Sequence, residues 1–206
     1  TDARSNTLIG KDAGTAITTG DYNVAVGANA LDANNTGIKN TAIGAIALSG
    51  NTTGTYNTAV GYSSLEANST GISNTALGYK ALEVNTTGSS NTAVGYFALV
   101  WNQTGTQNTA VGLDALENNT TGNDNVAIGL RALTANVTAH YNTAVGTNAL
   151  GANVSGGLNT AVGWQALSTT SSGSENTAIG GRSLENNTTA SYNTAVGYGS
   201  LFTNST

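Results

Sequence analysis

The sequence of 206 residues contains no cysteine and no methionine, and only 8% of its residues are charged. Without cysteine, no disulfide can stabilise the fold. Ordinary soluble domains are about 25% charged, so we expect a neutral polar surface built from Asn, Thr, Ser and Gly. The net charge of −5 argues against a nucleic-acid partner and makes an anionic membrane an unfavourable one.

Long apolar runs are also missing. No stretch approaches the roughly 20 residues of a membrane-spanning helix, and no signal peptide is recognisable, so insertion of this segment into a membrane is not expected. The chain begins with Thr1 rather than Met, and its last repeat stops at Thr206. These features predict a processed protein or a segment of a longer polypeptide.

What the sequence does contain is a repeat of seventeen residues. Residues 74–90 read NTALGYKALEVNTTGSS, and the next seventeen read NTAVGYFALVWNQTGTQ. The twelve copies begin at Asn6, Asn23, Asn40, Asn57, Asn74, Asn91, Asn108, Asn125, Asn142, Asn159, Asn176 and Asn193. A fixed period without insertions is typical of a solenoid, in which each copy forms one rung. We therefore expect one elongated domain over residues 1–206.

The positions of the repeat, numbered 1 to 17 from its first Asn, predict β structure. Position 5 is always Gly, position 15 is usually Gly, and positions 12 to 14 are polar, which leaves no run of helix formers. The predicted fold is all-β, a parallel β-solenoid of twelve rungs about 4.8 Å apart. Residues 1–22 are expected to form a degenerate N-terminal cap, because Gly14 replaces the usual Leu and Ile17 the usual loop Asn.

Alternation along a strand predicts which side chains form the core. Positions 2 and 4 share one face, and positions 3 and 5 share the other. Position 2 is mostly Thr, position 3 mostly Ala, position 4 aliphatic and position 9 mostly Leu. We expect position 4 to pack with position 9, as in Val60 with Leu65, while the Ala/Gly face allows close approach of another chain. The Asn at position 1 is expected to form a structural ladder along the stack.

Position 12 carries the one chemical motif, Asn followed two residues later by Ser or Thr. This is the pattern of N-glycosylation in a surface loop, and an acid stands two residues before the Asn in several copies. The alternative is plain turn chemistry, since Asn and Thr before Gly form local hydrogen-bonded turns. The candidate glycosylation sites are Asn34, Asn51, Asn68, Asn85, Asn102, Asn119, Asn136, Asn153, Asn187 and Asn204.

Aromatic side chains at position 6 are weaker candidates, because such a column either binds carbohydrate or covers the core. The candidate ligand-facing aromatics are Tyr62, Tyr79, Tyr96, Trp164 and Tyr198. Glu66 and Glu83, one rung apart, are too few carboxylates for a cation cage. His140 is the only His, so neither a His metal cluster nor a His-based nucleophile is expected. We predict no cofactor, no metal and no enzymatic activity.

Short strands of the repeat resemble a known family. Residues 23–27 (NVAVG) and 125–129 (NVAIG) resemble the SVAIG strand of the head repeats of trimeric autotransporter adhesins, and residues 78–81 resemble that family's following G-x-x-S/A. Similar NTAVGYxAL arrays occur in phage tail fibres and large extracellular proteins of aquatic microbes. The resemblance implies a left-handed β-roll, often trimeric, on extracellular fibres. The longer rung, the added N-x-T-G loop and the missing neck, stalk and anchor depart from the family.

Three functions are therefore compared. The first is a structural protomer of an extracellular or cell-surface fibre, glycosylated at position 12 and self-assembling head-to-tail or through its Ala/Gly face. The second is an adhesin head or tail-fibre segment that binds a surface glycan or matrix protein, as a trimer. The third is ice binding through the Thr column at position 2, which ranks last because Val24 and Val126 in that column suggest that it faces the core.

Overall fold

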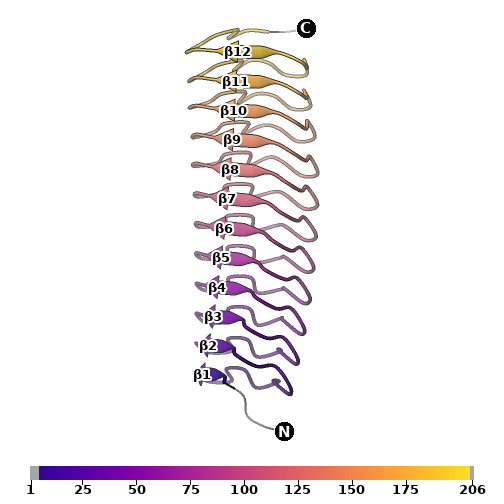
Figure 1. Cartoon of the computed structure of the whole chain (residues 1–206). Helices are drawn as coiled ribbons and strands as arrows, with labels where there is room; N and C mark the ends of the chain where they lie inside the picture. The colour runs from indigo at the N-terminus through magenta and orange to yellow at the C-terminus, as the bar shows by residue number, and fades with distance from the viewer. Residues whose placement is uncertain (1–4, 205–206) are drawn as a thin grey trace.

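The computed structural model describes residues 5–204 as a stack of rungs (Figure 1). Twelve parallel strands form one sheet in sequence order, and each pairs with the next position for position. The strands are β1 (Thr7–Ile9), β2 (Val24–Val26), β3 (Thr41–Ile43), β4 (Thr58–Val60), β5 (Thr75–Leu77), β6 (Thr92–Val94), β7 (Thr109–Val111), β8 (Val126–Ile128), β9 (Thr143–Val145), β10 (Thr160–Val162), β11 (Thr177–Ile179) and β12 (Thr194–Val196). The predicted parallel β-solenoid with a 17-residue repeat is confirmed, while its left hand stays a prediction.

Hydrogen bonds between rungs continue far beyond these short strands. The Lys80 N–H donates to the carbonyl of Tyr62 at 3.0 Å, the Leu82 N–H to Ala98 at 3.1 Å, and the Ser90 N–H to Ile72 at 2.9 Å. All three donors have left-handed backbone conformations, with φ between 54° and 59°. An L-residue in this region costs about 1–2 kcal/mol. The bonds between rungs offset this cost, because the left-handed residues turn their N–H groups along the stack.

The Gly at position 5 is required by the close stacking of rungs. Its φ lies between 120° and 142° in all twelve copies, a region that residues with a Cβ rarely adopt. A Cβ on Gly61 would also lie 2.4 Å from the carbonyl oxygen of Gly78 in the next rung. The repeat therefore tolerates no side chain where each strand ends.

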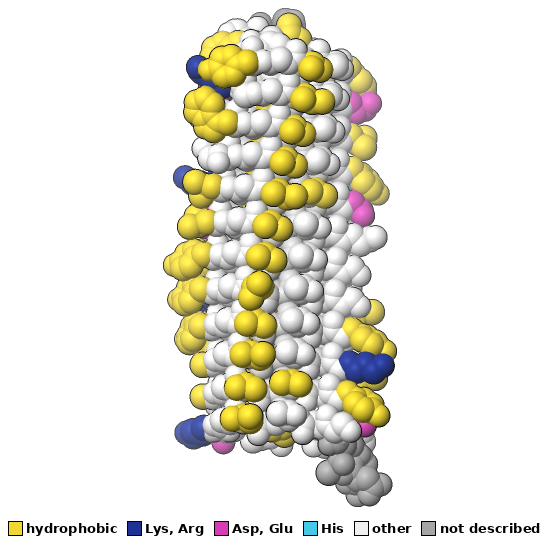
Figure 2. All heavy atoms as spheres, turned by 60° about the vertical axis from the view of Figure 1, so that its left-hand side comes forward, with side chains coloured by type: hydrophobic (Ala, Val, Ile, Leu, Met, Phe, Trp, Pro, Cys, Tyr) yellow, Lys and Arg dark blue, Asp and Glu magenta, His cyan; other side chains and the backbone are white. Residues whose placement is uncertain are grey.

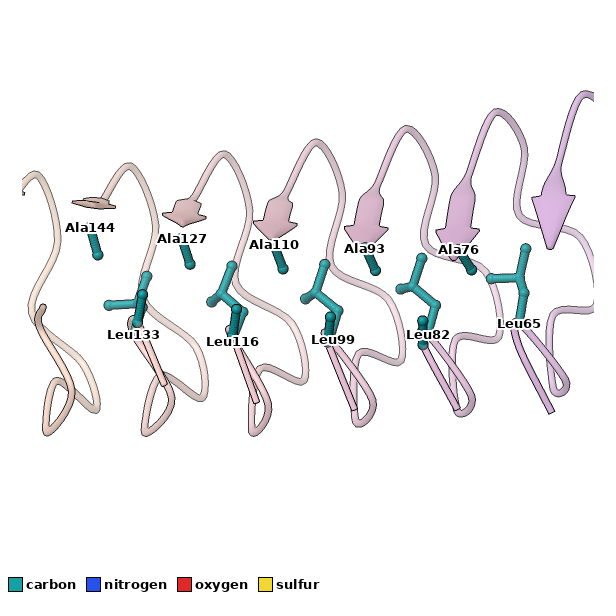
Figure 3. Close-up of a cluster of buried hydrophobic side chains, with 14 of the residues drawn as sticks. Leu65, Ala76, Leu82, Ala93, Leu99, Ala110, Leu116, Ala127, Leu133 and Ala144 are labelled. Carbon is teal, nitrogen blue, oxygen red and sulfur yellow. The ribbon is translucent and has the colours of Figure 1, made fainter. Parts of the chain in front are cut away.

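The core lies between the Ala at position 3 and the Leu at position 9. Both side chains are fully buried in the central rungs, and Figure 3 shows the Ala side chains of successive strands pointing toward Leu side chains on the opposite wall. The predicted packing of position 4 against position 9 is wrong. Val60 is only half-buried, and Ile43 and Leu77 are 40% and 47% exposed. Position 4 faces outward with position 2.

The Asn at position 1 explains why the strand faces this way. The Asn57 Nδ2 donates to the Gly71 carbonyl across the rung at 2.9 Å, and its Oδ1 accepts from the Asn74 backbone N–H at 2.9 Å. The predicted Asn ladder is thus confirmed, and it places the amide inside the rod. Because side chains alternate along a strand, position 3 must then also face inward.

The first rung shows the same packing with the two residue sizes exchanged. Leu8 replaces the usual Ala at position 3, and Gly14 replaces the usual Leu at position 9. A Cβ on Gly14 would lie 2.6 Å from Cδ2 of Leu8, so the Leu8 side chain occupies the space that the position 9 Leu fills elsewhere. Ile17, at position 12, packs against the core beside it.

Candidate functional surfaces

The position 12 Asn side chains are not at the surface. Nine of the ten candidate glycosylation sites, Asn34 through Asn187, are 0% exposed, and Asn204 is half-buried. A glycan would be attached to the side-chain Nδ2, which in Asn51 donates to the Gly54 carbonyl at 3.0 Å and to Asn34 Oδ1 at 2.7 Å. The expected exposed acceptor loop is therefore wrong, and turn chemistry accounts for the motif.

The carbonyl of the small residue at position 15, usually Gly, holds this loop closed inward. A Cβ on Gly54 would lie 2.3 Å from Oδ1 of Asn51 and 2.4 Å from the carbonyl oxygen of Gly71. The carbonyl at position 15 accepts from both buried Asn columns at once, as that of Gly88 does from Asn74 at 2.8 Å and Asn85 at 3.0 Å. The Ala139 carbonyl does the same, from Asn125 at 2.8 Å and Asn136 at 3.2 Å. The N-x-T-G motif is thus a structural device for closing a narrow rung.

The outer face of the sheet, which we call the Thr/aliphatic face, consists of positions 2 and 4 of every strand. The Thr side chains at position 2 are half-buried or exposed along its length. The position 2 Val residues, Val24 and Val126, are half-buried on the same outer face, so the expectation that this column faces the core is wrong. Figure 2 shows narrow columns of hydrophobic side chains running along the rod between uncharged columns. No residue at position 2 or 4 is charged.

The position 3 Ala side chains cannot serve as an assembly surface. They are 0% exposed in β2 through β11, because they fill the core of their own rod. The expected self-association through the Ala/Gly face is therefore wrong for this fold. The outward surfaces are instead the Thr/aliphatic face and the loops of positions 6, 10, 11, 13, 14, 16 and 17.

The aromatic column at position 6 stacks on itself. The ring centroids of Tyr62 and Tyr79 are 5.6 Å apart, and those of Tyr79 and Tyr96 are 5.1 Å apart, with interplanar angles of 13° and 12°. Phe97 packs obliquely against Tyr96 at 4.3 Å. The Tyr79 ring is stacked between two neighbouring rings, so neither of its faces is open to a sugar, and the column reinforces the stack of rungs.

The other two candidate aromatics lie near the C-terminal end. Trp164 is 49% exposed and Tyr198 is 76% exposed, and the Arg182 guanidinium lies 6.0 Å from the Trp164 ring. Arg182 also forms an ion pair with Glu185, and this hydrogen-bonded partner raises the pKa of the guanidinium. Trp164 therefore belongs to a local cluster rather than to the tyrosine column.

The acidic candidates do not form a site. Lys80 Nζ lies 2.8 Å from Glu83 Oε1, and this hydrogen bond raises the pKa of Lys80. Within residues 5–204, no three His, Cys, Asp or Glu side chains gather where they could hold a metal ion. The His140 Nδ1 accepts a hydrogen bond from the Asn123 backbone N–H at 2.9 Å.

No helix within residues 5–204 is long and apolar enough to cross a membrane.

Trp101 is a surface feature that the repeat analysis missed. It stands at position 11, where the other copies have Ala, Gly, Val, Asn or Thr, and it is 49% exposed. Open hollows of about 460 Å³ and about 180 Å³ lie against it. The signal in the sequence was the departure itself, a single large aromatic in a column of small residues.

Comparison of the chain with protein-family models, with curated proteins and with solved structures found no match. The geometry of these surfaces therefore carries the functional argument.

Proposed function

We propose that this chain is a structural protomer of an extracellular fibre, acting as a rigid rod rather than as a catalyst. The observation that carries the proposal is that hydrogen bonding between rungs continues without interruption along the rod. In-register pairing runs through all twelve strands, and the position 1 Asn ladder links every neighbouring pair of rungs from Asn6 to Asn193. Such a stack resists bending because each rung is bonded at several points around its perimeter.

The strand edges are the surfaces through which the rod would extend. The N–H at position 2 of each rung donates to the next rung, as Thr177 N–H donates to the Asn193 carbonyl at 2.8 Å. By the same geometry, Thr194 in β12 directs its N–H away from β11. Unpaired strand edges template the addition of another strand. A second copy whose β1 meets β12 would continue the same ladder.

The test is concentration-dependent assembly, measured by analytical ultracentrifugation and electron microscopy. We expect rods that lengthen in steps of one protomer. The variant Thr194→Pro removes the outward N–H and should stop this growth, whereas Thr194→Val keeps the N–H and should grow like the wild type. Monomers at all concentrations, or growth that Thr194→Pro leaves unchanged, would contradict the proposal. Trimers of fixed size would favour the adhesin alternative instead.

Ice binding is the second candidate, favoured by the outward position of the Thr column. The Thr/aliphatic face presents one hydroxyl and one methyl group per Thr at the strand spacing of about 4.8 Å. No hydrogen bond within residues 5–204 engages the hydroxyl of Thr75, Thr92 or Thr109, which leaves these groups free to bind ordered water. An uncharged, regular array of this kind can match a crystalline water lattice.

Thermal hysteresis and ice-crystal shape test this candidate. We expect the wild-type protein to shape ice crystals and Thr92→Tyr, which places a bulky ring in the middle of the face, to lose most of that activity. The matched variant Thr87→Tyr places the same ring on an exposed loop position and should keep it. Absence of hysteresis in the wild type would remove ice binding from consideration.

A further inference from the structure

We propose that Trp101 is the centre of a binding site for a neutral oligosaccharide. The site is the hollow of about 460 Å³ that spans three rungs beside the indole, and it is lined by Trp101, Gln103, Asn118, Thr120, Ala135 and Val137. This inference is independent of the fibre proposal, because a rod can display a ligand site whether or not it assembles.

Within residues 5–204, the Trp101 indole has no neighbouring ring stacked on it, unlike the rings of the tyrosine column. Trp101 is half-exposed, and it lines one hollow together with the small side chain of Ala135 two rungs further along. In the part of the chain that the structure describes, its ring takes part in no aromatic pair and no cation–π contact. A flat, partly desolvated indole suits the C–H face of a pyranose ring, since aromatic rings combine a large apolar surface with a preferred stacking geometry.

Polar groups with unused hydrogen-bonding capacity surround the indole. The Gln103 side-chain amide makes no hydrogen bond within residues 5–204, so its donors and acceptor are free. The Asn118 Nδ2 donates to the Thr134 carbonyl at 2.9 Å, which leaves its Oδ1 as an acceptor. The Thr120 hydroxyl donates to the Val137 carbonyl at 3.1 Å and keeps lone pairs that can accept. Sugar hydroxyls, which both donate and accept, complement this set.

The charge around the hollow selects a neutral sugar. None of the six lining residues is charged, so no cation is present to pair with a sulfate or carboxylate group. The hollow on the other side of the indole is lined by Lys80, Glu83 and Glu117. Because Lys80 is paired with Glu83 at 2.8 Å, the Glu117 carboxylate is left in excess and repels an anionic ligand. Ala135 and Val137 add apolar surface along the direction of the stack, which an oligosaccharide of more than one unit could follow.

The test uses the intrinsic fluorescence of Trp101. The chain has two Trp residues, so the variant Trp164→Phe leaves Trp101 as the only one. This protein is titrated with cellotetraose, mannotetraose, laminaritetraose and chitotetraose as neutral probes, and with sialyllactose as an anionic probe. We expect a saturable fluorescence change with at least one neutral tetrasaccharide and none with sialyllactose.

Variants locate the site. Trp101→Ala, measured by calorimetry with the bound sugar, should weaken binding by about tenfold or more, which corresponds to about 1.4 kcal/mol. Gln103→Ala should weaken it several-fold, because it removes the only side chain here with a wholly free amide. Trp101→Ala should leave thermal unfolding unchanged, since Ala is common at position 11. The matched variant Tyr79→Ala should leave sugar binding unchanged.

Each other outcome would overturn the proposal. Absence of a saturable signal with all four neutral tetrasaccharides at millimolar concentration would show that the hollow takes no such ligand. Binding that survives Trp101→Ala, or that is lost with Tyr79→Ala, would place the sugar elsewhere. Equal binding of sialyllactose would contradict the selection by charge.

Discussion

The two buried Asn columns lie in the same rungs, but they differ in continuity. At position 1, every Asn from Asn6 to Asn176 accepts from the backbone N–H of the Asn in the next rung. At position 12, side-chain amides link Asn34 through Asn136. The ladder is then interrupted, and it resumes only where Asn204 donates to Asn187 at 3.3 Å. Asn136 Oδ1 is buried without a hydrogen-bond partner, and Thr170 replaces Asn two rungs later.

The difference follows from the kind of partner that each column uses. Position 1 bonds to backbone groups, which are present in every rung whatever the sequence. Position 12 bonds between rungs through another side chain, so each link depends on the residue in the neighbouring copy. The first column therefore holds the rungs together, and the second adds stability where its sequence allows.

The largest expected effect is the loss of a position 1 amide from the middle of the rod. Asn91→Ala removes the acceptor for the Asn108 N–H at 3.0 Å and the donor to the Gly105 carbonyl at 2.8 Å. A buried unpaired N–H costs about 1–3 kcal/mol, and we expect a total loss of about 3 kcal/mol in the free energy of unfolding. Urea denaturation followed by circular dichroism measures it. A loss no greater than that of the outward variant Thr92→Ala would contradict this role.

Loss of a position 12 amide should cost less. Asn85→Ala removes two links between rungs, to Asn68 at 2.9 Å and from Asn102 at 2.8 Å, and one bond within the rung, to the Gly88 carbonyl at 3.0 Å. The Gly88 carbonyl keeps its bond from Asn74, so no backbone group is left unpaired. We expect about 1–2 kcal/mol of destabilisation in the same denaturation experiment. A cost equal to that of Asn91→Ala would show that the two columns do not differ as proposed.

Restoring Asn where the column is interrupted should stabilise the rod. In Thr170→Asn, the new amide can donate to the Gly173 carbonyl and to a neighbouring Asn, in place of the Thr170 hydroxyl bond to the Asn187 carbonyl at 2.7 Å. We expect a gain of about 1 kcal/mol, seen as a higher urea midpoint. Thr169→Asn, at the exposed neighbouring position, is the control and should change little. A lower midpoint for Thr170→Asn would mean that the native hydroxyl fits better.

The smallest effect is expected at the point where the position 12 ladder stops. Ala139 stands at position 15, where a Cβ on the equivalent Gly122 would lie 2.3 Å from Asn119 Oδ1. We infer that the Ala139 methyl group turns Asn136 Oδ1 away from Asn153. Ala139→Gly should restore the link, but added chain flexibility costs about 0.5–1 kcal/mol, so the stability should change by less than about 0.5 kcal/mol. NMR exchange of the Asn153 side-chain amide should slow. Unchanged exchange would refute the steric explanation.

The sequence predicted much of the fold, because the period, the Gly columns and the parallel stacking are local or translational properties. The sequence-based prediction of which strand face points into the core was wrong. The aliphatic column at position 4 favours its own face as the core, but the inward Asn of position 1 sets the alternation and turns the position 3 face inward. The exchange of Leu8 and Gly14 in the first rung was a readable signal, since compensating sizes at positions 3 and 9 imply direct contact.

The candidate sites were predicted less well, for related reasons. The N-x-T-G motif has the same sequence whether its Asn points toward solvent or into the rod. The Asn points inward because the position 15 carbonyl accepts a hydrogen bond from its side-chain amide, and this contact is visible only in the structure. The sequence left open whether the position 6 tyrosines bind carbohydrate or cover the core, and their mutual stacking depends on the register between rungs. Trp101 was overlooked because column averages hide a single departure.

The amino-acid sequence by itself determined the twelve 17-residue rungs, the all-β parallel stack and the requirement for Gly at position 5, because repetition forces like to stack on like. Only the tertiary structure decided that Ala and Leu form the core, that the Asn amides lie inside, and that non-Gly residues such as Leu82 adopt φ near 54°. The physical reason is that these choices are costly within one rung. They become favourable only when the neighbouring rungs supply the hydrogen bonds and the contacts.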